Sequence, residues 1–269
     1  MSRTVGQGPC AHHPMRILVL GGTSEASALV ALLAAEAGLA VTLSLAGRTA
    51  TPRPEPVATR IGGFGGAEGL AQWLAETGTE VVIDATHPFA ARISANAARA
   101  CAARSVPLLA VRRPAWAREE GDRWTEVGSV AASVEALGAT PKKVFLTIGR
   151  QELSAFAHAP QHRYVVRTIE PVGDALPVPD LVCLSARGPF TLEDEIRIMR
   201  EAGIEVLVTK NSGGAPTYPK IAAARRLGLP VVIVARPALP EVPSVPDAEG
   251  ARDWLAGVLR TRQEAGADS

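Results

Sequence analysis

Short apolar runs alternate with longer amphipathic stretches along this chain. Residues 16–20 (RILVL), 80–83 and 107–111 are mostly apolar, and each run gives way to glycine or polar residues. Nearly continuous apolar runs of this length are typical of strands buried on both faces of a parallel sheet. Between them, residues 25–37 and 89–104 have the apolar spacing of helices. The pattern predicts an open parallel sheet covered by helices.

The same alternation restarts after about residue 130. The expected strands are residues 16–20, 40–45, 80–83, 107–111, 142–148, 163–169, 181–185, 205–209 and 230–234, and the expected helices are residues 25–37, 67–77, 89–104, 130–138, 191–202, 218–227 and 248–259. We therefore expect an α/β protein of two Rossmann-like domains, residues 15–135 and 136–262, each with a parallel sheet and with a ligand cleft between them. Residues 1–14 are expected to form a disordered leader and residues 263–269 a frayed tail.

Composition narrows the possible functions. The 269 residues carry a formal net charge of +1, and only 4% are aromatic, which argues against a nucleic-acid or membrane-surface binder. No apolar run reaches the roughly 18 to 20 residues that span a bilayer. Three widely spaced cysteines exclude a disulfide framework, and no metal-spaced cluster or hydrolase or kinase motif is present. We therefore expect a cytoplasmic, monomeric protein without a metal site.

The loop after the first expected strand has the residues of a phosphate site. Gly21 and Gly22 let backbone N–H groups approach an anion, and Thr23, Ser24 and Glu25 open the following helix. The run departs from the G-x-G-x-x-G pattern. The alternative is a tight turn in which Thr23 or Ser24 caps the helix.

The end of the second expected strand and the turn after it carry Ser44, Ala46, Gly47 and Arg48. An NAD site usually has an acid at this point for the ribose hydroxyls, whereas here an arginine is present. A guanidinium can pair with a 2′-phosphate, so the turn predicts NADP rather than NAD. A solvated surface arginine is the alternative.

Two further motifs lie near the same expected edge. Gly62, Gly63 and Phe64 belong to a glycine-rich loop that can pack over a nucleotide, or whose phenylalanine can plug the core. Asp84 and His87 follow another strand and could transfer protons, although an aspartate there often only braces a loop.

The second half of the chain is cationic at its strand ends. These residues are Arg150, Arg167, Arg187, Lys210 and Arg236. Clustered cations favour a substrate that carries several carboxylates, although each one could instead be a salt-bridged surface residue. The loop that begins at Lys210 adds an amide, a hydroxyl and two glycines, a combination that can clamp an anion.

These motifs together resemble the precorrin-6A reductase family of cobalamin biosynthesis. The resemblance rests on ILVLGGTSEA (17–26), SLAGR (44–48), GGFGG (62–66), DATHPFA (84–90), TIGRQEL (147–153), RGPF (187–190) and VTKNSGG (208–214), and it covers about residues 15–260. It implies hydride delivery from NADPH to C19 of the precorrin-6A macrocycle and addition of a proton at C18, which gives precorrin-6B.

The resemblance also implies roles for individual residues. The cofactor would contact Gly21, Gly22, Thr23, Ser24, Glu25, Ser44, Ala46, Gly47, Arg48, Gly62, Gly63, Phe64, Asp84, Ala85 and Thr86, and the substrate would contact His87, Arg150, Arg187, Gly188, Lys210, Asn211, Ser212 and Gly213. The proton donor stays open among His87, Lys210, Ser212 and water. Two other functions remain as alternatives: a nucleotide- or tetrapyrrole-binding module without activity, and a two-domain glycosyltransferase-like enzyme.

Overall fold

The computed structural model describes residues 13–47 and 54–267 and divides the chain into two compact units. Within the described residues, unit 1 comprises residues 13–47, 54–112 and 239–267, and unit 2 comprises residues 113–238. Each unit is built around one six-stranded sheet whose paired strands are all parallel. The expected fold class is therefore confirmed. The ligand cleft between the units stays a prediction.

The sheet of unit 1, called sheet A, has the strand order β12-β5-β4-β1-β2-β3. Its strands are β1 (Met15–Leu20), β2 (Leu39–Leu45), β3 (Ala58–Ile61), β4 (Val81–Asp84), β5 (Leu108–Val111) and β12 (Ser244–Val245). The order reverses between β1 and β4, which is the topological switch point where open α/β sheets bind ligands. In the register, Leu20 of β1 pairs with both Ser44 of β2 and Asp84 of β4. The loops after these three strands therefore begin at the same edge.

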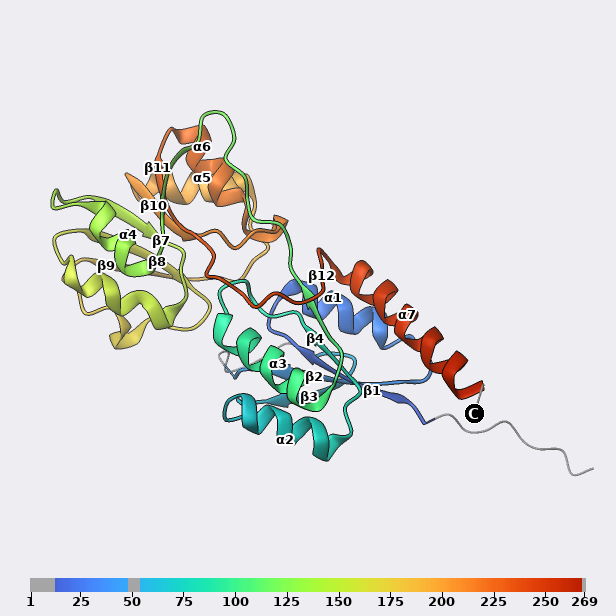
Figure 1. Cartoon of the computed structure of the whole chain (residues 1–269). Coiled ribbons are helices and arrows are strands. Elements are labelled where there is room, and N and C mark those ends of the chain that lie inside the picture. The colour runs from blue at the N-terminus through green and yellow to red at the C-terminus, as the bar shows by residue number, and fades with distance from the viewer. Residues whose placement is uncertain (1–12, 48–53, 268–269) are drawn as a thin grey trace, which may run out of the picture. The chain divides into compact units, whose positions relative to one another are not determined.

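Alternate residues of β1 pack on opposite faces of sheet A. Ile17 and Val19 contact the core beneath α1 (Ser24–Leu33) and α7 (Ala248–Ala267), whereas Leu18 and Leu20 contact the core beneath α2 (Ala67–Thr77) and α3 (Ala91–Arg104). Figure 1 shows α7, the red helix at the end of the chain, lying beside the blue α1. Burial on both faces explains why β1 is an uninterrupted apolar run.

The sheet of unit 2, called sheet B, has the order β6-β11-β10-β7-β8-β9. Its strands are β6 (Arg123–Val127), β7 (Lys143–Leu146), β8 (Arg163–Thr168), β9 (Leu181–Ser185), β10 (Val206–Lys210) and β11 (Pro230–Val234). One face packs against α4 (Val130–Leu137) and the 3₁₀ segment η1 (Arg150–His158), and the other against α5 (Leu192–Glu201) and α6 (Pro219–Leu227). Two shorter 3₁₀ segments, η2 (Gly173–Ala175) and η3 (Ala215–Thr217), lie in its loops.

The division between the units differs from the predicted boundary at residues 135/136. Unit 2 already begins at Arg113, because β6 pairs with β11 and thus supplies an edge strand of sheet B. The chain then returns to unit 1 at Leu239, where β12 pairs with β5 and α7 packs on α1. Sheet B is thus built from one continuous segment, whereas sheet A takes its sixth strand, β12, from sequence that follows unit 2.

Three further expectations need correction or lie outside the described residues. The strands β3, β6 and β12 were not expected, since each is short or largely exposed and lacks an apolar run. The helix α7 extends to Ala267, beyond the predicted end at residue 259, and so includes most of the segment expected to form a tail. The predicted leader falls almost wholly on residues 1–12, which lie outside the described part. No helix in the described ranges is long and apolar enough to cross a membrane.

Candidate functional site

The loop between β1 and α1 is shaped by two glycines with different roles. A Cβ on Gly21 would lie 2.5 Å from Cδ1 of Leu43, so this glycine is needed for close packing of the loop on β2. Gly22 has a φ of +107°, which side chains rarely adopt, and a Cβ there would meet nothing within 4 Å. The backbone at Gly22 is therefore open to a ligand, directly before the start of α1. A helix start favours anions.

Thr23 joins this loop to the end of β4. Its hydroxyl accepts a hydrogen bond from the Ala26 N–H (3.1 Å), which makes it the N-cap of α1, and donates one to the Ala85 carbonyl (2.7 Å). The hydroxyl of Ser24 donates to the carboxylate of Glu25 (3.0 Å). The capping alternative is thus correct for the Thr23 side chain. The first backbone N–H groups of an α-helix have no acceptor within the helix, and so they can bind an anion.

The end of β2 carries no acidic residue. Ser44 is buried there, and its hydroxyl accepts a hydrogen bond from Nη1 of Arg60 on β3 (2.7 Å). Ala46 and Gly47 follow, and Gly47 has a φ of +72°. Arg48, the predicted partner of a 2′-phosphate, lies outside the described residues. Sequence reasoning missed Arg60, because the strand that carries it was not expected.

The glycine-rich loop folds back toward Ser44 through Arg60. The carbonyls of Gly62 and Gly63 accept hydrogen bonds from the Arg60 guanidinium at 3.0 and 3.1 Å. Phe64 packs edge-on against Trp73 of α2, with ring centroids 5.5 Å apart, and joins the core beneath α2 and α3. The interpretation of Phe64 as a core plug therefore describes its packing in this structure.

The loop after β4 is braced from within. The Asp84 carboxylate accepts hydrogen bonds from both the N–H (3.2 Å) and the hydroxyl (2.6 Å) of Thr86, and the Asp84 side chain is buried. The ring of His87 accepts from the Phe89 N–H through Nδ1 (3.2 Å). When the ring is neutral, this bond places its proton on Nε2. Asp84 is thus a structural brace, and His87 has the proton-carrying nitrogen on its other edge.

The corresponding edge of sheet B is formed by the loops after β7, β9 and β10. At the end of β10, the Lys210 ammonium forms an ion pair with the carboxylate of Glu152 in η1. Arg150 is exposed and donates through Nε to the Val172 carbonyl (3.2 Å), and Arg187 is exposed after β9. These three cations lie at or after the ends of strands of one sheet, as predicted.

The polar side chains of the loop after β10 hold the loop itself. The amide of Asn211 pairs with both backbone groups of Trp116: its Oδ1 accepts from N–H (2.8 Å) and its Nδ2 donates to C=O (3.0 Å). The Ser212 carbonyl accepts from Nε of Arg113 (2.8 Å) and from Nη2 of Arg236 (3.1 Å). Asn211 and Arg236 therefore shape the loop, and Arg236 does not act as a solvent-facing cation for substrate as the sequence suggested.

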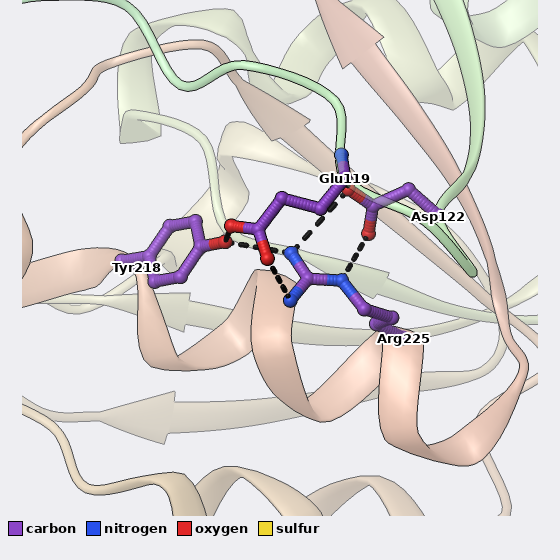
Figure 2. Close-up of polar contacts among 4 residues, drawn as sticks. All are labelled: Glu119, Asp122, Tyr218 and Arg225. Atoms are coloured by element: carbon purple, nitrogen blue, oxygen red, sulfur yellow. Dashed lines mark hydrogen bonds and ion pairs between the residues drawn. The ribbon is translucent and has the colours of Figure 1, made fainter.

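A second hydrogen-bond network connects α6 to residues 119–122. Figure 2 shows Arg225 of α6 between the carboxylates of Glu119 and Asp122, with the Tyr218 hydroxyl completing the group. Arg225 donates to Asp122 through Nε (2.9 Å), to Glu119 through Nη1 (2.8 Å) and to Tyr218 through Nη2 (2.6 Å). The hydrogen bond with Asp122 is the main reason why the pKa of Arg225 is raised. The network joins both ends of α6, through Tyr218 and Arg225, to the chain before β6.

Three charged side chains of unit 2, Arg167, Glu195 and Lys220, are buried. Arg167 of β8 forms an ion pair with Glu195 of α5 (2.8 Å), and both side chains are at most 5% exposed. The guanidinium carbon of Arg167 lies 3.7 Å from the ring centroid of Phe190. Lys220, at the start of α6, is also buried. Arg167 is thus covered and paired, and does not face substrate as the sequence suggested.

Burial lowers the pKa of Lys220 to about 7, with the nearby Arg167 as the second cause; Glu195 opposes the shift and Arg113 adds to it. Because an unfolded lysine titrates near pH 10.4, burial of the charged amine destabilises the fold below about pH 7, and this penalty disappears as the pH rises toward about 10. We expect Lys220→Met to be more stable than the wild type by about 1–2 kcal/mol at pH 6, with an advantage that shrinks at higher pH. Urea unfolding at several pH values measures this difference, and a constant difference would contradict the prediction.

Comparisons with known proteins show relatives that match over most of the chain. A family model described as precorrin-6x reductase CbiJ/CobK matches residues 16–256. The chain is 52% identical over 245 residues to a precorrin-6A reductase from a Sinorhizobium species, covering 90% of this chain and 94% of that protein. It is 49% identical over 241 residues to the precorrin-6A reductase of Rhodobacter capsulatus, covering 90% and 96%. A solved structure of a CobK precorrin-6A reductase matches with a TM-score of 0.86 and 48% identity, over 90% of this chain and 96% of that one. The chain belongs to the precorrin-6x reductase family.

Proposed function

We propose that the chain is an NADPH-dependent reductase that converts precorrin-6A to precorrin-6B in cobalamin biosynthesis, with hydride transfer to C19 and proton addition at C18. The backbone at Gly22 is the observation that carries the cofactor part of this proposal. It is open on its Cβ side, adopts a φ of +107° and precedes the first turn of α1 at the switch point of sheet A. These features fit a dinucleotide phosphate, and no acid follows β2 to favour NAD.

The bound cofactor would supply the hydride, and the side chains would bind and orient. Gly22, Thr23 and Ser24 would hold the phosphates at the start of α1, next to the end of β4 through the Thr23–Ala85 hydrogen bond. Arg150, Arg187 and Lys210 would face the acetate and propionate groups of the substrate. Asn211 would keep the loop after Lys210 in place through its two bonds to Trp116.

Two side chains at the strand ends would suit the role of proton donor to the macrocycle. The neutral His87 ring carries its proton on Nε2, because Nδ1 accepts from Phe89. The Lys210 ammonium is kept near the end of β10 by Glu152. We propose His87 and Lys210 as the proton donors to test first, with Ser212 and water as the others.

The proposal is tested anaerobically with purified protein, NADPH and precorrin-6A, by following nicotinamide oxidation and the macrocycle spectrum together. We expect stoichiometric changes in both signals and a product two hydrogens heavier by mass. Binding of both ligands without any change would favour a binding module instead. Failure to bind NADPH, with tight binding of a nucleotide sugar, would favour the glycosyltransferase-like alternative.

A further inference from the structure

Arg60 lies beside the end of β2, at the point where an NAD-binding sheet would carry its acid. It is the direct register partner of Ser44 across the β2–β3 pair. Its Nη1 donates to the Ser44 hydroxyl (2.7 Å) and to the Gly62 carbonyl (3.0 Å), and its Nη2 donates to the Gly63 carbonyl (3.1 Å). The guanidinium is therefore held in one orientation by three neutral acceptors.

An aromatic ring covers one face of this guanidinium. The Arg60 carbon Cζ lies 3.8 Å from the centroid of Phe64, and Phe64 is in turn supported by the edge of Trp73. Stacking of this kind orients a guanidinium as well as stabilising it. Because Phe64 and the three acceptors fix the side chain before any ligand arrives, little conformational entropy would be lost on binding.

The positive charge of Arg60 has no carboxylate partner within the part of the chain that the structure describes. Burial lowers the pKa of its guanidinium, which means that its surroundings destabilise the charge. Three of its five N–H groups are occupied by the contacts above, so Nε–H and one Nη2–H remain for an acceptor. The Ser44 hydroxyl accepts from Arg60, and its own hydrogen is therefore available to a second acceptor. A dianionic phosphate provides both the missing charge and these acceptors.

We propose that Arg60 determines cofactor specificity by binding the 2′-phosphate of NADPH, with the Ser44 hydroxyl as a second donor. This inference rests on the proposed function and assigns a phosphate-binding role to a residue on β3. A purely structural role for Arg60, as a brace of the Gly62–Gly63 turn, would affect all adenine nucleotides alike. A phosphate-binding role affects only those that carry the 2′-phosphate.

The test uses calorimetric titration of the full chain with adenosine 2′,5′-bisphosphate and with 5′-AMP. Arg60→Gln keeps an amide donor near Ser44 but removes the charge. We expect its affinity for the bisphosphate to fall about 10- to 100-fold and its affinity for 5′-AMP to change less than about twofold. Arg60→Lys, which keeps the charge but loses the planar fork, should lose less. Arg99→Gln, at an exposed arginine of α3 paired with Glu68, is the matched control and should bind both probes like the wild type.

The outcomes separate this inference from the proposed function. If the wild type prefers NADPH to NADH and Arg60→Gln keeps that preference, Arg60 does not bind the 2′-phosphate and the inference fails alone. Equal losses for both probes would likewise overturn it in favour of the structural role. If the wild type binds neither NADPH nor the bisphosphate, the proposed function fails, and the inference fails with it. Should Arg60→Gln not fold, the same comparison is made with Arg60→Lys.

Discussion

Replacing Glu195 with glutamine should lower the free energy of unfolding of unit 2 by about 3–5 kcal/mol, because a buried cation then loses its partner. Glu195 is fully buried and lies 2.8 Å from the guanidinium of Arg167. Lys220 is buried close enough for Glu195 to affect its charge. Lys220 can lose its proton at neutral pH, whereas Arg167 cannot. The uncompensated charge on Arg167 therefore dominates the expected loss.

Urea unfolding, together with amide exchange of β8, α5 and α6, measures this effect and assigns it to unit 2. Glu201→Gln is the matched control, because Glu201 lies on the same helix but is exposed. Its ion pair with Arg197 is longer, at 3.8 Å. It should change stability by less than about 0.5 kcal/mol. Equal stabilities of Glu195→Gln and Glu201→Gln would show that the buried pair contributes no net stabilisation.

Replacing Gly213 with alanine should destabilise unit 2 by about 4 kcal/mol or more, for two reasons that act together. Gly213 has a φ of +66°, which is unfavourable for a residue with a side chain. A Cβ there would also overlap the Pro114 carbonyl and the Arg236 guanidinium. Both of those groups belong to the hydrogen bonds that hold the loop after β10, so the loop cannot move aside without breaking them.

Gly228→Ala separates these two reasons. Gly228 ends α6 with a φ of +65°, almost the same as Gly213, but a Cβ there would meet nothing within 4 Å. It should therefore cost only the backbone strain, about 1–2 kcal/mol. Chemical denaturation of both variants tests the comparison. If the two substitutions lower the stability equally, the loop after β10 can shift to accept the added Cβ, and the overlap argument is wrong.

Much of the fold could be predicted because buried parallel strands are apolar runs that end in recognisable turns. The residues of β1, β4 and β10 show this directly, since their side chains are almost all buried. The same logic located Gly22, Asp84 and Lys210 at the carboxyl ends of strands. Local pattern fails where a strand is an exposed edge: β3 and β6 have mixed sequences, and β12 has two residues.

The assignment of individual polar side chains was less predictable. The sequence places Arg167 and Arg236 at strand ends just as it places Arg150, but it does not reveal that Arg167 is paired with Glu195 or that Arg236 binds backbone carbonyls. Glu195 lies 28 residues from Arg167 along the chain. The carbonyls bound by Arg236 belong to Asn211 and Arg113, which lie 25 and 123 residues away. Whether a cation faces solvent or a buried partner depends on such distant contacts.

The sequence by itself determined the parallel α/β class, the loops at the strand ends and the family motifs, because each depends on residues close together in the chain. The tertiary structure alone decided that β6 joins β11, that β12 and α7 return to unit 1, and that Arg60 lies beside Ser44. The physical reason is that strand pairing and burial depend on contacts between segments that are distant in the sequence. A local pattern does not specify which distant segment will pair with it.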